Sequence, residues 1–233
     1  MRLDAALRVD ATCDTFDVSG MGGSPASITL THGVYLPDAL ADEMESQLQS
    51  AVDPGIGVSF VSGVLTVTWS SGVGAITWSS NPRLRDYLGC TGSLLGSSGS
   101  ATADGPCAGI FLASLPWSAP SPLSWRLDVA RAPTWRGGGK GILRALHRVW
   151  SVTARATPDE LPALRRVLGT LLAGLPGRLH MDVDNPDPWS ASDPYGYADV
   201  YLAQDGRQYV DRWFTLPSRL ACEIDLEFAE VPT

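Results

Sequence analysis

A chain of 233 residues with 44% hydrophobic residues and eight tryptophans can build a packed core, which excludes a wholly disordered protein. A formal net charge of −8 argues against a protein that wraps nucleic acid, because such a protein needs a basic surface to displace counterions. Only 18% of the residues are charged, and this low fraction suits a protein that buries part of its surface in an assembly.

Neither a membrane segment nor a secretory signal is indicated. No stretch approaches the ~20 apolar residues of a membrane helix, and residues 1–4 lead into an alternating segment rather than a continuous apolar one. The four cysteines are scattered without a Cys-x-x-Cys pair, which argues against a zinc knuckle or a thioredoxin-like motif. Cys90 and Cys107 flank a Gly/Ser-rich segment and could be neighbours, although buried reduced thiols made in a cytosol are the favoured interpretation.

Residues 27–69 form the unit around which the N-terminal half is organised. Residues 27–31 alternate apolar and polar side chains, as a half-buried strand does. Residues 37–51 predict a helix with Pro37 in its first turn, where the missing N–H is not needed. The apolar positions of this helix lie four residues apart and predict one face packed on a sheet: Leu40, Met44 and Leu48.

A hairpin completes this unit. Residues 58–60 and 64–69 predict two strands joined at Ser62-Gly63, and residues 73–78 predict a further strand. We expect the edge of the hairpin at residues 64–69 to be free to pair with another subunit, because an exposed strand edge recruits partners.

The rest of the N-terminal half ends in a proline-rich segment. Residues 81–89 predict a short helix that Gly89 ends, and residues 110–115 predict a strand. Between them, residues 91–106 are dominated by Gly and Ser and predict a long loop that contacts neighbouring subunits and becomes ordered only on assembly. A domain boundary is predicted near residue 118, where prolines gather: Pro116, Pro120 and Pro122.

The C-terminal half predicts strands around a single helix. Alternating patterns predict strands at residues 123–129, 146–154 and 179–183. Thr157 and Glu160 have the spacing of a capping box. They precede a helix with a broad apolar face: Leu161, Leu164, Val167, Leu168, Leu171 and Leu172.

The last part of the chain predicts a hairpin and a final strand. Residues 197–203 and 208–216 are expected to pair around Asp205-Gly206, a favoured hairpin turn. In the final strand apolar residues alternate with acids, so a slip of one residue would bury the acids. The fold class expected is therefore α+β, with two strand-rich domains at residues 1–118 and 119–233. Each has an antiparallel or mixed sheet and one packed amphipathic helix.

No residue is predicted to be catalytic, to bind a cofactor or to bind a metal. The glycine run before Lys140 lacks the hydroxyl residue that must follow the lysine of a phosphate-binding loop. Residues 180–187 are acidic, but Pro186 falls at a ligand position of a calcium loop and no Gly follows. The serines lack the Gly-x-Ser-x-Gly spacing of a nucleophile elbow, and each histidine is better explained as structural.

Tryptophans and the hairpin edge are the candidate interface. Tryptophan is enriched in buried protein–protein interfaces, although scattered aromatic residues can also stack on sugars. The loop at residues 185–196 is a second candidate contact and, like residues 91–106, is expected to become ordered on assembly. The predicted interface residues are Val64, Val67, Trp69, Trp117, Trp135, Trp189 and Trp213.

The N-terminal half resembles a module in virion proteins of tailed bacteriophages. In that module a strand leads to a Gly/Tyr turn, a helix, a hairpin and a closing Leu-Gly step. Residues 27–90 carry the resemblance through Ser-Ile-Thr-Leu-Thr, Gly33-x-Tyr35, Leu40-Ala41, Val58-x-Phe60, Leu65-Thr66-Val67 and Leu84-x-x-Tyr87-Leu88-Gly89. The C-terminal half is similar to the small strand–helix–strand domains of phage tail and tail-tip proteins around Gly177-Arg178-Leu179-His180, but departs from them in residues 185–196.

This resemblance implies a non-enzymatic structural component of a phage particle, made in the bacterial host cytoplasm and placed in the tail, tail tip, baseplate or head–tail junction. Its partners would be other virion proteins and copies of itself in a ring, without nucleic acid or membrane. The alternative is a carbohydrate- or receptor-binding module on a phage fibre. A hydrolase acting on cell-wall material is disfavoured, because the sequence shows no recognisable nucleophile or metal set.

Overall fold

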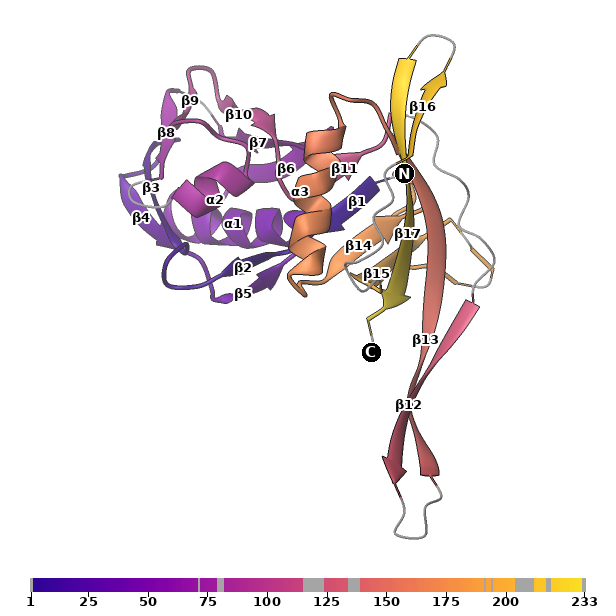
Figure 1. The fold of residues 1–233 in the computed structure, drawn as a ribbon. Coiled ribbons are helices and arrows are strands. Elements are labelled where there is room, and N and C mark those ends of the chain that lie inside the picture. The colour runs from indigo at the N-terminus through magenta and orange to yellow at the C-terminus, as the bar shows by residue number, and fades with distance from the viewer. Residues whose placement is uncertain are drawn as a thin grey trace. The chain divides into compact units, whose positions relative to one another are not determined.

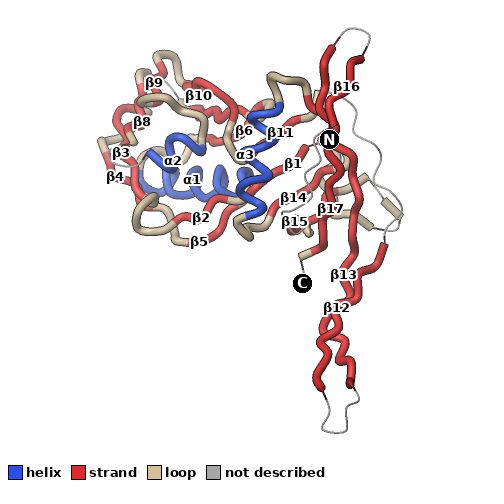
Figure 2. The backbone as a smooth tube through the Cα atoms, viewed as in Figure 1, coloured by secondary structure: helices blue, strands red, loops and turns tan. Residues whose placement is uncertain are grey.

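The chain folds as a strand-rich α+β protein, as predicted, with antiparallel sheets and three helices among its described residues (Figure 1). A computed structural model describes the backbone of residues 2–70, 72–78, 82–114, 124–133, 139–190, 192–193, 195–203, 212–216 and 219–231. Side chains are described for these residues outside 124–133, 139–147, 212–216 and 219–223. Strands dominate the backbone trace (Figure 2).

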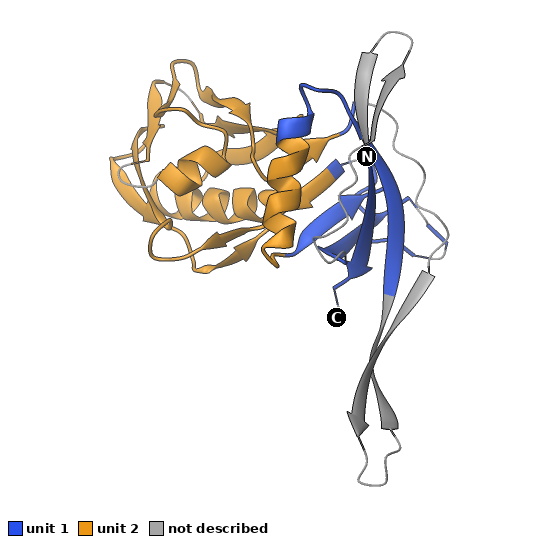
Figure 3. Ribbon diagram, viewed as in Figure 1, with its two compact units in different colours: residues 1–2, 113–162, 176–233 blue, residues 3–112, 163–175 orange. Residues whose placement is uncertain are grey.

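The chain divides into two compact units that are not the predicted domains (Figure 3). Unit 2 contains residues 3–112 and 163–175, and unit 1 contains residues 1–2, 113–162 and 176–233. The first long segment of unit 2 ends close to the boundary expected near residue 118. The prediction of residues 119–233 as one domain differs from this division, because most of the C-terminal helix is grouped with the N-terminal segment.

Unit 2 is built from short strands and helices. Its helices are α1 (Pro37–Ala51), α2 (Pro82–Tyr87) and most of α3 (Leu161–Leu172). Its strands are β1 (Arg2–Ala5), β2 (Leu7–Val9), β3 (Thr15–Gly20), β4 (Ala26–Thr29), β5 (Gly33–Tyr35), β6 (Gly57–Val61), β7 (Val64–Thr68), β8 (Gly74–Thr77), β9 (Leu94–Gly96), β10 (Ser100–Pro106) and β11 (Ile110–Leu112).

Two small sheets and two pairs of neighbouring strands organise these elements. One sheet has the order β4-β3-β8-β9, a second has the order β10-β7-β6, and β2 pairs with β5. β1 is the neighbour of β11. One hydrophobic cluster runs through the unit, so the small sheets share a core rather than forming separate ones.

Helix α1 forms where the sequence predicts it. Pro37 lies in its first turn, and the predicted apolar stripe is fully buried: Leu40, Met44 and Leu48 are each 0% exposed. Burying three such side chains contributes roughly 1.5–3 kcal/mol each. Two glutamates of the helix bind backbone amides of other segments: Glu43 accepts a 2.9 Å hydrogen bond from the N–H of Thr31, and Glu45 a 2.8 Å bond from that of Val58. Apolar burial and these bonds together fix the helix against the strands.

Residues 91–106 are not the long loop that was predicted. They contain β9 and β10, and β10 pairs with β7 from Ser100↔Thr68 to Pro106↔Val64. Ala101 and Ala103 are buried, whereas their neighbours Ser100 and Thr102 are exposed. The segment therefore has the alternation of a strand, with alanines too small to give the strong apolar signal expected of one.

Unit 1 contains one antiparallel sheet with strands of 4 to 18 residues. They are β12 (Ser124–Pro133), β13 (Gly139–Ala156), β14 (Gly177–His180), β15 (Tyr197–Leu202), β16 (Arg212–Leu216) and β17 (Arg219–Glu230). Their order is β14-β15-β17-β13-β12, and β16 also pairs with β17. The buried side of the sheet is lined by register partners: Trp150 with Phe228, Val152 with Leu226, and Ala154 with Ile224.

The predicted hairpin between residues 197–203 and 208–216 is wrong in its pairing. β15 pairs with the end of β17 from Val200↔Glu230 to Leu202↔Phe228, while β16 pairs with its beginning from Arg212↔Glu223 to Leu216↔Arg219. The 12 residues of β17 are long enough to serve both strands. Asp205-Gly206 lies outside the described residues.

Two other predictions in unit 1 are confirmed in part. The predicted strand at residues 179–183 ends at His180, and residues 181–184 form bends and turns. Before helix α3, the Glu160 carboxylate accepts hydrogen bonds from both the N–H and the hydroxyl of Thr157, at 2.8 and 2.9 Å. Only one of the two hydrogen bonds of the predicted capping box forms, the one from the Thr157 N–H to the Glu160 carboxylate. The Thr157 hydroxyl donates to the same carboxylate instead of accepting a hydrogen bond from a backbone N–H.

Candidate interaction surfaces

The hairpin edge at residues 64–69 is not free, so this predicted interface is wrong. β7 is the central strand of its sheet and pairs with β6 on one side and β10 on the other. Val67 and Trp69 are 0% and 5% exposed, and Val64 is half-buried. These side chains belong to the core because β10, predicted as a loop, covers the edge that was expected to recruit a partner.

The remaining predicted tryptophans have different outcomes. Trp117 and Trp135 lie outside the described residues, and Trp213 lies on β16, where side chains are not described. Trp189 is half-buried. Its ring packs edge-on against Trp150, with centroids 6.3 Å apart, and the guanidinium of Arg148 lies 4.7 Å from its centroid. Trp189 therefore packs against residues of its own unit.

The described part of the loop at residues 185–196 is held by its own hydrogen bonds. The side-chain amide of Asn185 donates to Asp193 at 2.8 Å, and the N–H of Trp189 donates to the carbonyl of Tyr197 at 2.7 Å. Its order therefore does not need a neighbouring subunit, contrary to expectation. That the loop contacts a neighbour remains a prediction. Just before it, Asp182 and Asp184 are exposed in turns, not on a strand.

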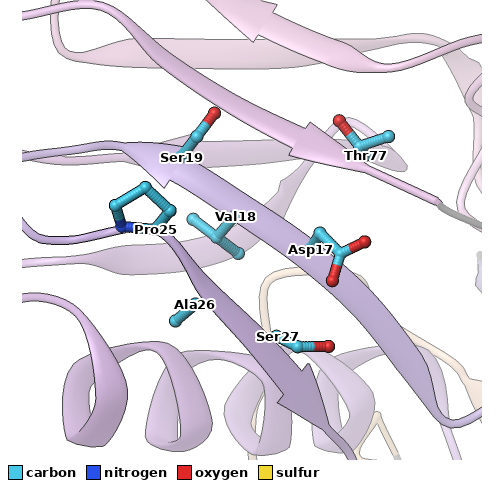
Figure 4. A pocket seen from close by; sticks show the side chains of 7 residues that line it. All are labelled: Asp17, Val18, Ser19, Pro25, Ala26, Ser27 and Thr77. Carbon is cyan, nitrogen blue, oxygen red and sulfur yellow. The ribbon is translucent and has the colours of Figure 1, made fainter.

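A hollow of about 340 Å³ lies on the outer face of the β4-β3-β8-β9 sheet (Figure 4). It arises from register: Asp17 on β3 is the partner of Ser27 on β4 and of Thr77 on β8. Partners in an antiparallel sheet share a face, so a carboxylate stands between two hydroxyls across three strands. Figure 4 shows these side chains side by side, with Ser19 and Pro25 along the same depression.

Asp17 differs from most carboxylates of unit 2. Among the described residues of that unit, Asp17 and Asp42 are the two carboxylates without a polar partner. Asp42 is exposed on α1, whereas Asp17 is half-buried in the hollow. The backbone N–H of Thr31 lowers the pKa of Glu43, and the N–H and hydroxyl of Thr91 lower the pKa of Asp104.

The ladder between β12 and β13 is the longest strand pairing of the described residues. It runs from Ser124↔Val149 to Pro133↔Gly139, with an irregularity after Asp128. β17 pairs with β13 only from Val149 to Ala156. The part of β13 before Val149 therefore has β12 as its one described strand partner.

The cysteines with described side chains are buried thiols. Cys13, Cys90 and Cys107 are buried and form no disulfide bond, which agrees with the favoured interpretation of reduced, buried cysteines. Burial, with the nearby charge of Asp104, raises the pKa of the Cys90 thiol to about 11. Such a thiol is protonated at neutral pH and a poor nucleophile.

The hollow was not predicted from the sequence. A signal was present in the strands themselves, since Asp17, Ser27 and Thr77 are the polar members of alternating segments. Their convergence could not be deduced, because it depends on β8 pairing with β3 rather than with a neighbour in sequence.

No helix of the described residues is long and apolar enough to cross a membrane. No protein-family model matches the chain. No curated protein and no solved structure matches it either.

Proposed function

We propose that this chain is a non-enzymatic structural component of a tailed-phage particle and that it works by assembling with copies of itself and with other virion proteins. The resemblance of residues 27–90 to a virion module supports the setting. The β12–β13 ladder is the observation that carries the mechanism.

The ladder has a pattern suited to assembly. Its register pairs Leu127 with Leu146 and Val129 with Leu143, and the polar pair Arg126 with His147 stands next to the first of these. Register partners share a face of an antiparallel ladder and successive pairs alternate, so Leu127 with Leu146 lies on one face and Arg126 with His147 on the other. A two-stranded ribbon is marginally stable alone in water and gains stability when its apolar face is covered. A neighbouring subunit supplies such a cover in a ring or filament.

Electron microscopy of native particles, combined with mass spectrometry of their proteins, tests the proposal. The chain is expected in the particle as a repeated density in the tail, tip, baseplate or head–tail junction. The purified chain is expected to form rings or filaments alone or with a virion partner. A chain that stays monomeric with every virion partner and is missing from particles contradicts the proposal.

The second candidate, a carbohydrate- or receptor-binding module on a fibre, is favoured by one observation. Tyr195 and Tyr201 are 65% and 37% exposed, and exposed aromatic rings can stack on sugars. Titration of the isolated chain with host surface glycans distinguishes the two functions. Saturable binding that Tyr195→Ala abolishes would support the fibre module.

A further inference from the structure

The hollow at Asp17 presents hydrogen-bond acceptors and no cation. Its lining residues are Asp17, Val18, Ser19, Pro25, Ala26, Ser27 and Thr77. An ionised carboxylate only accepts hydrogen bonds, and the hydroxyls of Ser19, Ser27 and Thr77 can accept as well as donate. No lysine, arginine or histidine lines the hollow, so it does not suit a phosphate or another anion.

A cationic side chain is the ligand that this arrangement favours. A half-buried carboxylate without a hydrogen-bond partner has lost part of its hydration. A guanidinium or ammonium group compensates for the lost hydration with a charge-assisted hydrogen bond. A bare calcium ion is a poorer fit because it takes six to eight oxygen ligands. A stacked sugar is also a poorer fit because no aromatic ring lines the hollow.

The same chain carries a concentrated source of such cations. Residues 124–149 contain six basic residues and one acid: Arg126, Asp128, Arg131, Arg136, Lys140, Arg144 and Arg148. This segment has a net charge of +5, and because the whole chain has −8, the rest of it carries −13. Opposite charges in two regions of one chain favour head-to-tail contact between copies. Lys140 is the single lysine of the chain.

From the unpartnered Asp17, the acceptor-lined hollow and this division of charge, we infer that the hollow of one copy binds a basic side chain from the β12–β13 ladder of a second copy. The inference rests on the proposed function, since it names the partner surface for copy-to-copy assembly. It makes the β4-β3-β8 face the acceptor and the β12–β13 ladder the donor of a heterologous contact.

Charge removal on the full-length chain tests the acceptor. Asp17→Asn is compared with Asp42→Asn, which removes the same charge from the other unpartnered carboxylate of unit 2. Sedimentation velocity is expected to show self-association weakened roughly tenfold or more by Asp17→Asn and about twofold at most by Asp42→Asn. High salt should weaken the wild-type contact, because it is charge-dependent. Equal effects of the two variants overturn the inference.

Zero-length carbodiimide coupling tests the donor. The wild-type chain has one amine on the ladder, at Lys140, and three single variants, Arg126→Lys, Arg131→Lys and Arg144→Lys, each add a second one. Mixing ¹⁵N-labelled with unlabelled chains separates links between copies from links within one. A link between copies that joins Asp17 to at least one of these lysines supports the inference. Coupling only to other acids, or only within one chain, overturns it.

The two proposals fail differently. If the wild-type chain does not associate with itself at any concentration or on the particle, assembly between copies is wrong and the inference fails with it. If the wild type assembles and Asp17→Asn assembles equally well, the inference fails alone. A glycan that binds the hollow and is lost in Asp17→Asn overturns the inference in favour of the fibre module.

Discussion

Unit 2 has strands of three to seven residues tied together by side chains that bind backbone amides, whereas strands in unit 1 reach 18 residues and their side chains bind each other across the ladder. In unit 2, Glu43, Glu45 and Asp104 each accept from a backbone N–H elsewhere in the unit. In unit 1, the hydroxyl of Thr153 on β13 donates to its register partner Asp225 on β17, and the ion pair Arg178–Asp199 joins register partners on the shorter β14 and β15. Short strands have few ladder bonds, so they depend on side chains for position, while long strands are positioned by the ladder itself.

The largest expected effect tests whether Trp69 belongs to the core of unit 2 or to an interface. Trp69→Ala should destabilise the chain by about 3–5 kcal/mol, because it empties a buried site and leaves the carbonyl of Gly72 without the indole N–H it accepts at 3.1 Å. Urea unfolding measures the loss. The control is Val61→Ala in the adjoining strand, whose side chain is 60% exposed and should change stability by about 0.5 kcal/mol at most. A stable Trp69→Ala chain that no longer assembles would restore the interface role.

A smaller effect is expected where unit 1 uses a side chain to bind backbone amides. Glu160→Ala should cost about 1–2 kcal/mol, a typical loss for a helix cap, because the N–H groups of Thr157 and Ser114 lose their acceptor. Asp159→Ala removes the same charge from the neighbouring exposed position. Thermal unfolding of both variants checks the result, and equal melting temperatures would contradict the capping role.

Acid should weaken the link between α1 and Thr31, which lies between β4 and β5. The pKa of Glu43 is lowered from 4.5, chiefly by the backbone N–H of Thr31. A lowered folded-state pKa gives stability that is present above pH 4.5 and lost as the pH falls through the folded pKa. Glu43→Gln should therefore cost about 1 kcal/mol or less at pH 7 and still less at pH 3. Denaturant unfolding at both values measures the difference, and an unchanged cost at pH 3 would show that the charge is not responsible.

The smallest effect is expected for a contact between register partners in unit 1. The guanidinium of Arg178 binds both oxygens of Asp199, at 2.6 and 3.1 Å, and lies 3.9 Å from the ring centroid of Tyr197. Arg178→Lys keeps the charge but loses the planar fork, and should cost about 0.5–1 kcal/mol. A double-mutant cycle with Asp199→Asn isolates the pair. A cost well above that range would mean that side chains, not the ladder, position these strands.

The sequence predicted the elements that have a clear local pattern. Helix α1 was predicted over the residues it occupies, because a proline start and a four-residue apolar repeat are local signals. The Ser62-Gly63 hairpin was predicted for the same reason. The predictions were wrong where a strand pairs with a segment that is distant in the sequence. β10 was predicted as a loop, and β15 and β16 were predicted to pair with each other instead of with β17. The Asp17 hollow belongs to this second group, because three separate segments build it.

The place of β7 at the centre of its sheet has a consequence for the order of folding. Its partner β6 is two residues away across Ser62-Gly63, both of which have positive φ (50° and 79°), as a type I′ turn requires. Hairpins of this kind close in about 1–10 μs. Its other partner, β10, pairs Ser100 with Thr68 and must wait for the chain between them to close. We expect substitutions in the turn to slow folding and substitutions in β10 chiefly to speed unfolding, which makes β10 the strand whose loss first uncovers the edge of β7.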